Sequence, residues 1–393
     1  MDAAVLVVGA GPAGLAVAAC LRQRGVDTLV LDRGDAVGDS WRRRYDRLHL
    51  HTPRIQSALP GMRMPASLGQ WVAKDDMAEY LRRYAQRYGV VPRFQTEVRR
   101  LERDEGHWTA LTDDGDVTAR QVVIATGYSC SPVQPNWPGQ GTFGGEVVHA
   151  SEYRSPAAYV DRDVLVVGAG NTGAEIAADL ADGGAARVRL SVRTPPNVIP
   201  RQLGPVPTAL LAIPMEYSPA WLVDPVNRLL QRWFVGDLTR YGLPAARDGL
   251  VAQARATGAV PTIDVGLVKA LRAGKVAPVA AVARFEGGEV VLVDGSRFAP
   301  DAVIAATGYT TGLPPLVGHL SVLDARGKPL VSGARSLPSA PGLRFVGFSF
   351  PLKGHLLQIR LDARATARVI ARELRGSWPA LHPAPGSGDI SAS

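Results

Sequence analysis

The chain has 393 residues, of which 46% are hydrophobic and 20% are charged. This composition is typical of packed globular proteins and excludes a disordered chain. The formal net charge is +8, but the basic residues are scattered and the longest basic run is Arg42–Arg44. We interpret this charge as a basic surface that favours anionic cofactors, and we expect no nucleic-acid partner.

Cysteine usage and the N-terminus favour a cytoplasmic protein. Cys20 and Cys130 form no CxxC pair and cannot make a disulfide framework. A strand begins at Ala3, which leaves no room for a signal peptide, and no apolar run reaches about 20 residues. We therefore expect no integral membrane segment. The histidine spacings match no common metal motif, so we predict no metal.

The chain opens with a strand, a glycine turn, a helix and a second strand. The strands are Ala3–Val8 and Thr28–Leu31, and the helix is Leu15–Arg24. In such a GxGxxG turn the glycines permit a tight bend, a close pyrophosphate and close packing of helix on strand. Asp32 follows the second strand, where an acidic side chain accepts hydrogen bonds from a free ribose 2′-OH, as in FAD or NAD. The predicted contacts are Gly9, Gly11, Pro12, Ala13, Gly14, Asp32 and Arg33.

The same unit recurs in the middle of the chain. A strand at Val164–Val167, a helix at Ala174–Leu180 and a strand at Arg187–Val192 surround a second glycine turn. Arg193 stands at the strand tip, where a guanidinium suits a 2′-phosphate, so this unit is predicted to take NADPH. The alternative is that Arg193 is a solvent-exposed residue; Arg201 is a second candidate for the phosphate. The predicted contacts are Gly168, Gly170, Asn171, Thr172, Gly173 and Arg193.

Two further buried strands end in similar glycine turns, at Val122–Tyr128 and Val303–Tyr309. These turns add Thr126, Gly127, Thr307, Gly308 and Tyr309 to the predicted cofactor contacts. The proline-rich segment Pro195–Pro261 is predicted to be an inserted helical wall, and Gln358–Leu374 a C-terminal helix.

The predicted fold class is α/β, with two Rossmann-like dinucleotide-binding domains, the second inserted into the first. The FAD domain comprises residues 1–158 plus 300–375. The NADPH domain comprises 159–299, with the helical insert at about 200–260. Residues 376–393 form a flexible tail, since Pro, Gly and Ser prevail there.

The segment Phe143–Arg154 resembles the signature of the flavin-containing monooxygenases at every fixed position, including Phe143, His149 and Arg154. Tyr153 replaces the Trp of the Baeyer–Villiger branch. Within the family the chain looks closest to the YUCCA-like flavin monooxygenases. That likeness covers nearly the whole length but weakens at Phe348–Gln358. The segments that carry it are Gly38–Trp41, Tyr45–Pro53, Tyr241–Leu243 and Pro261–Gly266.

The resemblance implies FAD, NADPH and O₂, and oxygen transfer through a C4a-(hydro)peroxyflavin to a small-molecule substrate. The acceptor is either an amine or sulfide, or a carbonyl such as that of a 2-keto acid. Leu48 lies in the segment that is similar to the one lining the flavin in this family, and Trp41, in the segment before it, is also a predicted cofactor contact. His51 stands where amine oxygenases of the family have Asn. His51 is either a hydrogen-bond partner of the oxygenated flavin or a packed residue.

Several alternatives stay open. A flavin reductase, an electron-transfer flavoprotein or a flavin-bound scaffold would share the paired turns, and a homodimer is compatible with them. Leu203–Val235 is a candidate pocket wall, with core or lid packing and a membrane-surface helix as the alternatives. Lys353 and His355 are candidates for contact with an acidic substrate. The apolar residues of the wall are Leu210, Leu211, Met215, Trp221, Leu229, Trp233 and Phe234.

Overall fold

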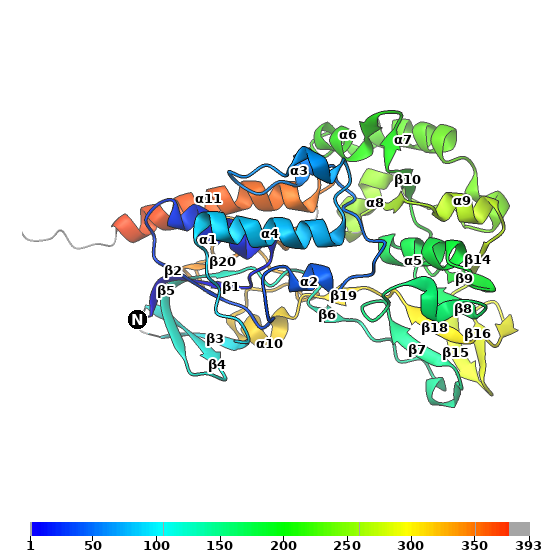
Figure 1. Ribbon diagram of the computed structural model, residues 1–393, viewed down its shortest axis with the longest axis horizontal. Helices are drawn as coiled ribbons and strands as arrows, with labels where there is room; N and C mark the ends of the chain where they lie inside the picture. Colours follow the sequence, from blue (N-terminus) through cyan, green and yellow to red (C-terminus); the bar gives the residue numbers. More distant parts are fainter. Residues whose placement is uncertain (1, 105, 259, 350, 377–393) are drawn as a thin grey trace, which may run out of the picture.

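The structure is a computed structural model that describes residues 2–104, 106–258, 260–349 and 351–376. The protein is built on two separate large sheets, which lie on the left and on the right of Figure 1. The first sheet has the order β2–β1–β5–β4–β3, and β20 also pairs with β5. Its strands are β1 (Ala3–Val8), β2 (Thr28–Leu31), β3 (Val98–Asp104), β4 (His107–Thr112), β5 (Val117–Ile124) and β20 (Leu343–Phe345).

Helices cover one face of the first sheet. They are α1 (Pro12–Arg22), α4 (Lys74–Tyr88) and α11 (His355–Gly376), and α1 packs along α11. Strand β1 and the end of β5 are apolar at nearly every position because both of their faces are buried. The other face packs against α10 (Leu313–Val317), which is followed by the short turn η5 (Gly318–Leu320). These layers place the carboxyl ends of β1 and β5 beside the first glycine turn.

The second sheet is parallel throughout, in the order β14–β9–β8–β18–β7. Its strands are β7 (Glu146–His149), β8 (Asp163–Val167), β9 (Arg187–Ser191), β14 (Val276–Val279) and β18 (Ala302–Ala305). One face carries α5 (Asn171–Asp182) and α9 (Leu267–Arg272). The other carries a small antiparallel sheet of β15 (Val282–Glu286), β16 (Glu289–Leu292) and β17 (Arg297–Phe298). The α/β class with two Rossmann-like units is thus confirmed.

Sheet membership differs from the predicted domain boundaries at two strands. Both β7 and β18 were predicted to belong to the first domain, but β18 pairs with β8 and β7 in the second sheet. The sequence shows each strand's burial but not its neighbours, and β18 lies between two strands that are close to each other in sequence. Figure 1 shows the chain crossing between the sheets where β6 (Ser131–Pro132) pairs with β19 (Tyr309–Thr310).

The insert is helical, as predicted, and lies at one end of the molecule, at the upper right of Figure 1. Its helices are α6 (Thr208–Met215), α7 (Ala220–Phe234) and α8 (Leu250–Thr257), with a 3-10 turn η4 (Leu238–Tyr241). Two small strand pairs hold it: β10 (Val198–Pro200) with β13 (Thr262–Asp264), and β11 (Gln202–Leu203) with β12 (Val206–Pro207).

Short helices complete the described chain. They are α2 (Asp39–Arg42), α3 (Arg54–Ser57), η1 (Ala66–Leu68), η2 (Gln140–Thr142) and η3 (Pro156–Tyr159). Helix α11 extends the predicted C-terminal helix by a few residues at each end. Of the predicted tail 376–393, Gly376 is the last residue of α11, and residues 377–393 lie outside the described residues. Among the helices that are described, none has the length and apolar character needed to cross a bilayer.

Candidate active site

The first glycine turn has the geometry of a pyrophosphate cradle. Gly9 has φ +108°, a conformation that side chains rarely adopt. A Cβ on Gly14 would lie 1.8 Å from the Gly9 carbonyl oxygen, whereas a Cβ on Gly11 would meet nothing within 4 Å. Pro12 is the first residue of α1, and Gly11 gives no side-chain cap. The N–H groups of the first turn are therefore available to an anion in the space that Gly11 leaves open.

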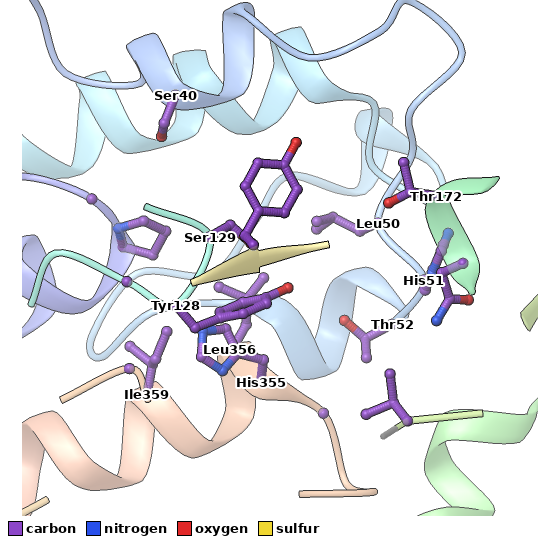
Figure 2. A pocket seen from close by; sticks show the side chains of 18 of the residues that line it. Ser40, Leu50, His51, Thr52, Tyr128, Ser129, Thr172, His355, Leu356 and Ile359 are labelled. Carbon is purple, nitrogen blue, oxygen red and sulfur yellow. The ribbon is translucent and has the colours of Figure 1, made fainter. Parts of the chain in front are cut away.

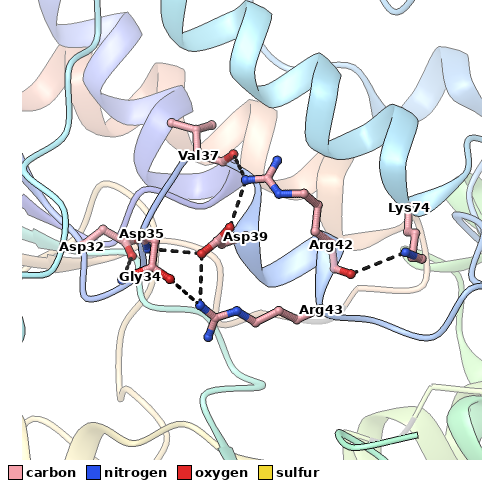
Figure 3. Close-up of polar contacts among 8 residues, drawn as sticks. All are labelled: Asp32, Gly34, Asp35, Val37, Asp39, Arg42, Arg43 and Lys74. Atoms are coloured by element: carbon pink, nitrogen blue, oxygen red, sulfur yellow. Dashed lines mark hydrogen bonds and ion pairs between the residues drawn. The ribbon is translucent and has the colours of Figure 1, made fainter. Parts of the chain in front are cut away.

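Asp32 organises the loop beside this turn. Its carboxylate accepts hydrogen bonds from Ala10 N at 2.5 Å and from Gly34 N at 2.7 Å. Figure 3 shows the continuation of this loop, where the Asp39 carboxylate accepts from Arg42 and Arg43, at 3.0 and 3.1 Å. Asp32 also lines the main cavity. Its place and charge fit the predicted ribose contact.

The second glycine turn repeats the first. Gly168 has φ +113°, and a Cβ on Gly173 would lie 1.8 Å from the Gly168 carbonyl oxygen. Asn171 has a structural role: its Nδ2 donates to Pro261 O at 3.0 Å and its Oδ1 accepts from Ile263 N at 2.8 Å. The Asn171 amide thus fastens β13 to the start of α5.

Both turns open into one cavity of about 1130 Å³. This single space brings together most residues predicted to contact a cofactor, and the tandem turns fit two dinucleotides. The predicted residues that line it are Gly9, Gly11, Pro12, Ala13, Asp32, Arg33, Trp41, Leu48, His51, Thr126, Gly127, Gly170, Asn171, Thr172, Gly173, Gly308 and Tyr309.

Four predicted residues do not line the cavity: Gly14, Gly168, Arg193 and Thr307. Gly14 is buried where α1 meets the turn, and Gly168 supplies the carbonyl that Gly173 approaches. Thr307 Oγ1 donates to Val133 O at 2.6 Å. Arg193 is exposed just beyond the end of β9. Its contact with a 2′-phosphate remains a prediction, beside the alternative of a solvent-exposed arginine.

One buried polar atom favours a cofactor at the junction of the two turns. Thr126 Oγ1 is buried and finds no hydrogen-bond partner among the described residues. Buried hydroxyls normally have a partner. Because Thr126 lines the cavity directly after β5, a bound flavin is a fitting partner for it.

His51 belongs to a buried polar network that joins the two halves of the protein. His51 Nε2 lies 3.2 Å from Glu175 Oε2 and Tyr45 OH donates to the same oxygen at 2.8 Å. Glu175 lies on α5 and is 2% exposed. Burial raises the pKa of Tyr45, and the Glu175 charge raises it further, so the phenol keeps its proton. Sequence reasoning missed Glu175; the signal was an acidic residue among the apolar residues of the predicted helix Ala174–Leu180.

The signature segment Phe143–Arg154 has a structural role. His149 is fully buried, with Nδ1 2.9 Å from Ser151 Oγ and Nε2 3.2 Å from Gly308 O. Tyr153 OH donates to Asp179 Oδ2 on α5 at 2.8 Å. These contacts tie the loop after β7 to the turn after β18 and to α5.

Arg201 lines the cavity and has a buried nitrogen without a hydrogen-bond partner among the described residues. The Arg201 guanidinium stacks 4.1 Å from the centroid of the Trp71 ring, and its Nη2 donates to Leu50 O at 2.5 Å. Among the described residues, Arg201 Nε and Asn227 Nδ2 are both buried without a hydrogen-bond partner. Burial lowers the pKa of Arg201 to about 10, so the side chain remains cationic at neutral pH. Both residues line the cavity, which offers these donors to an anionic ligand.

Lys353 does not line the cavity. Its Nζ is 3.0 Å from Glu216 Oε1 and donates to Tyr217 OH at 2.8 Å. The positive charge of Lys353, which was a candidate for contact with an acidic substrate, is thus paired with Glu216 instead. His355 does line the cavity, 5.5 Å from Tyr128 between ring centroids (Figure 2), and burial lowers its pKa.

The predicted wall is only partly right. Leu211 and Met215 of α6 and Leu230 of α7 line the cavity. The predicted wall residues Leu210, Trp221, Leu229, Trp233 and Phe234 do not line it, and the last four are exposed residues of α7. The apolar pattern of the sequence did not distinguish the two faces of this helix.

Comparison with known proteins agrees with this architecture. Residues 6–201 match the family model for pyridine nucleotide-disulphide oxidoreductases. The probable indole-3-pyruvate monooxygenase YUCCA4 of Arabidopsis thaliana is 35% identical over 88% of this chain and 84% of its own length. The indole-3-pyruvate monooxygenase YUCCA1 of Oryza sativa subsp. japonica is 36% identical over 88% of this chain and 86% of its own length.

Solved structures show the same likeness. A flavin-containing monooxygenase from Stenotrophomonas maltophilia superimposes with a TM-score of 0.72 and 26% identity, over 95% of this chain and 100% of its own. An open form of cyclohexanone monooxygenase shares the fold, with a TM-score of 0.72 at 19% identity, over 95% of this chain and 88% of its own.

The paired glycine turns and their common cavity fit a flavoprotein that binds two dinucleotides, and the relatives identify the class as the class B flavin monooxygenases. The chain belongs to the flavin-dependent monooxygenase family that includes the YUCCA proteins, and it is an oxidoreductase that uses FAD and NADPH. The family resemblance stated from the sequence is thus confirmed.

Proposed function

We propose that the protein oxygenates a small 2-oxo acid with NADPH and O₂, converting it to the carboxylic acid that is one carbon shorter. The balanced reaction consumes the oxo acid, O₂, NADPH and a proton, and releases the shorter acid, CO₂, NADP⁺ and water. The observation that carries this choice is the half-buried Arg201 guanidinium, whose buried Nε has no hydrogen-bond partner among the described residues that line the cavity. A buried cation attracts a carboxylate and repels an ammonium group, which disfavours amines as substrates.

The relatives support the same choice. The relatives that are 35% and 36% identical to this chain are named as a probable and an established indole-3-pyruvate monooxygenase, and indole-3-pyruvate is a 2-oxo acid. Sulfide oxygenation has no corresponding feature in the cavity, because a neutral sulfide does not use a guanidinium.

In this proposal FAD occupies the first glycine turn and NADPH the second. Gly9, Gly11 and Gly14 form the first cradle, Asp32 meets the ribose and Thr126 meets the flavin. Gly168, Gly170 and Gly173 form the second cradle, and Arg193 binds the 2′-phosphate. When bound, the reduced flavin supplies the activated oxygen atom, while the protein binds, orients and excludes water.

His51 is the candidate catalytic residue because it lines this cavity. In the neutral tautomer whose Nε2–H donates a hydrogen bond to the Glu175 carboxylate, Nδ1 carries the lone pair. A lone pair of this kind accepts a hydrogen bond from a bound group. Leu211, Met215 and Leu230 form an apolar wall that limits water around the reacting atoms.

Replacement of Arg201 tests this function. We expect Arg201→Gln to raise KM for an aromatic 2-oxo acid such as phenylpyruvate by about 10- to 100-fold, the loss of one charge-assisted hydrogen bond. KM for NADPH should stay within about twofold, since this proposal gives the 2′-phosphate to Arg193. A larger rise in KM for NADPH than for the oxo acid would place Arg201 on the cofactor and contradict the substrate assignment. Arg326→Gln, an exposed arginine on a surface loop, is the matched control.

A further inference from the structure

Helix α7 has an apolar face that no described residue covers. Trp221 and Trp233 are 77% and 79% exposed, and they share this face with exposed apolar side chains between them. The spacing 222, 226, 229, 233 repeats every three to four residues, which places these positions on one side of a helix. The other exposed apolar residues of this side are Leu222, Val226 and Leu229. We call the set Trp221, Leu222, Val226, Leu229 and Trp233 the α7 face.

The orientation of α7 is fixed by its inner side. The buried Asp224 carboxylate accepts hydrogen bonds from Val251 N and Ala252 N at the start of α8, at 2.8 and 3.1 Å. Gln231 Nε2 donates to Val198 O of β10 at 2.8 Å. Because these polar anchors lock one side of the helix inward, its apolar side is held outward.

The charges along the α7 face have one sign. Arg228 and Arg232 are exposed and lie one turn apart, along the row of Trp221. The acidic residue of the helix, Asp224, is buried on the inner side. An apolar sector with tryptophans and an arginine edge is the pattern of helices that lie in the interface of an anionic bilayer. The whole chain, with a net charge of +8, adds attraction of the same sign.

A second copy of this chain fits the face less well. A two-fold dimer contact brings a patch against its own copy, so Arg228 and Arg232 would approach their equivalents. Like charges at such a contact oppose association, whereas anionic lipid headgroups complement them.

The position of the α7 face links it to the cavity. The inner side of the same helix presents Asn227, Leu230 and Gln231 to the cavity. Figure 1 shows α6 and α7 at the outer end of the molecule, away from the first sheet. The helix therefore separates the cavity from whatever the outer side contacts.

We propose that the α7 face docks the protein peripherally on an anionic membrane surface, with the tryptophans in the headgroup region and the two arginines at its edge. This goes beyond the proposed reaction and does not depend on it. A membrane contact at α7 sets the substrate cavity directly behind the lipid surface.

Vesicle sedimentation of the FAD-loaded protein tests the proposal without turnover. Vesicles of phosphatidylcholine with about 30% phosphatidylglycerol should bind the protein, and phosphatidylcholine alone should bind it at least about tenfold more weakly. Tryptophan emission should shift to shorter wavelength on the anionic vesicles. Absence of binding to both vesicles, or equal binding to both, would overturn the proposal.

Two double variants locate the contact. Trp221→Gln with Trp233→Gln should abolish binding, and Arg228→Gln with Arg232→Gln should weaken it at least about tenfold. Matched controls are Val91→Gln for an exposed apolar residue and Arg103→Gln with Arg326→Gln for two exposed arginines, and these should bind as the parent does. Binding that survives in the tryptophan variant would contradict the docking face. A concentration-dependent dimer that this variant dissolves, without vesicle binding by the parent, would assign the face to a second copy instead.

Discussion

At the scale of single residues, the polar network around Glu175 is the feature that connects fold and chemistry. One carboxylate oxygen serves both Tyr45 and His51, which come from the first half of the chain, while Glu175 comes from the second dinucleotide unit. Buried polar groups that lose their partner cost about 1–3 kcal/mol each. The network therefore stabilises the contact between the two halves and holds the His51 ring in one orientation.

Substitution of Glu175 separates these two roles. Glu175→Ala should lower the free energy of unfolding by about 2–4 kcal/mol, since Tyr45 OH and His51 Nε2 lose their acceptor in a buried site. Glu175→Gln keeps an acceptor oxygen and should lose less. Urea denaturation measures both, and the ratio of hydrogen peroxide to product in NADPH turnover reports His51. If Glu175→Gln retained stability and coupling alike, its charge would have no role in positioning His51.

Cofactor choice is also decided at single residues. Arg193→Ala should raise KM for NADPH about tenfold or more and leave KM for NADH nearly unchanged, because only NADPH carries the 2′-phosphate. Steady-state kinetics with both cofactors measures this difference. Equal effects on the two would support the alternative that Arg193 is a solvent-exposed residue.

Burial of His149 gives stability a pH dependence. Burial lowers the pKa of His149 in the folded state, so the unfolded chain binds a proton first as the pH falls. The stability that comes from keeping His149 neutral is fully present above about pH 6.5, the usual pKa of histidine. It is lost as the pH falls from there through the lower pKa of His149 in the folded state. The denaturation midpoint should thus decrease on acidification, with a shallower slope in His149→Asn. Burial also lowers the pKa of His355, so the His149→Asn variant should still lose some stability on acidification. An unchanged slope in the variant would show that His149 titrates alike in both states.

At the scale of elements, each position of a glycine turn tolerates an added Cβ atom differently. Gly14→Ala should destabilise the fold, because its Cβ would lie 1.8 Å from a carbonyl oxygen. Gly11→Ala should fold normally but bind little FAD, because its Cβ meets no protein atom and enters the space left for the pyrophosphate. Thermal midpoints and the flavin absorbance of purified protein distinguish the two. Gly141→Ala, also without neighbours, is the matched control. Full FAD content in Gly11→Ala would contradict the first turn as the FAD site.

The elements around both turns could be predicted from the sequence because their signals are local. Strand β1 was predicted at its observed bounds, and α1 begins three residues earlier than predicted because Pro12 itself starts the helix. Strands β7 and β18 lie within the residue ranges predicted for the first domain but pair in the second sheet, since pairing partners across the chain leave no local signal. The outward face of α7 was taken for a wall for a similar reason: helical periodicity shows that two faces exist but not which one is covered.

The candidate site divides in the same way. Glycine turns and strand-tip residues have fixed spacings, and most of them line the cavity. Glu175, Asn227 and the cavity-facing position of Arg201 arise from contacts between distant segments, so spacing could not reveal them. The expected role of Lys353 was wrong because its partner Glu216, the residue after α6, is more than a hundred residues away in the chain.

At the scale of the whole molecule, two dinucleotide units and one inserted helical wall enclose a single cavity. Both units contribute residues to its lining, and the insert adds Arg201 and Asn227. The Arg47 guanidinium adds a further link between the halves, 2.9 Å from Asp182 at the end of α5. Such a shared cavity requires both sheets in place, which accounts for the polar contacts concentrated on α5.

Turnover with oxygen-18-labelled O₂, NADPH and an aromatic 2-oxo acid tests the central claim most directly. The account predicts a carboxylic acid one carbon shorter that carries one labelled oxygen atom, formed in step with CO₂ and NADPH oxidation. NADPH oxidation that yields only hydrogen peroxide, or an acid without the label, would contradict it and favour a flavin reductase or oxidase.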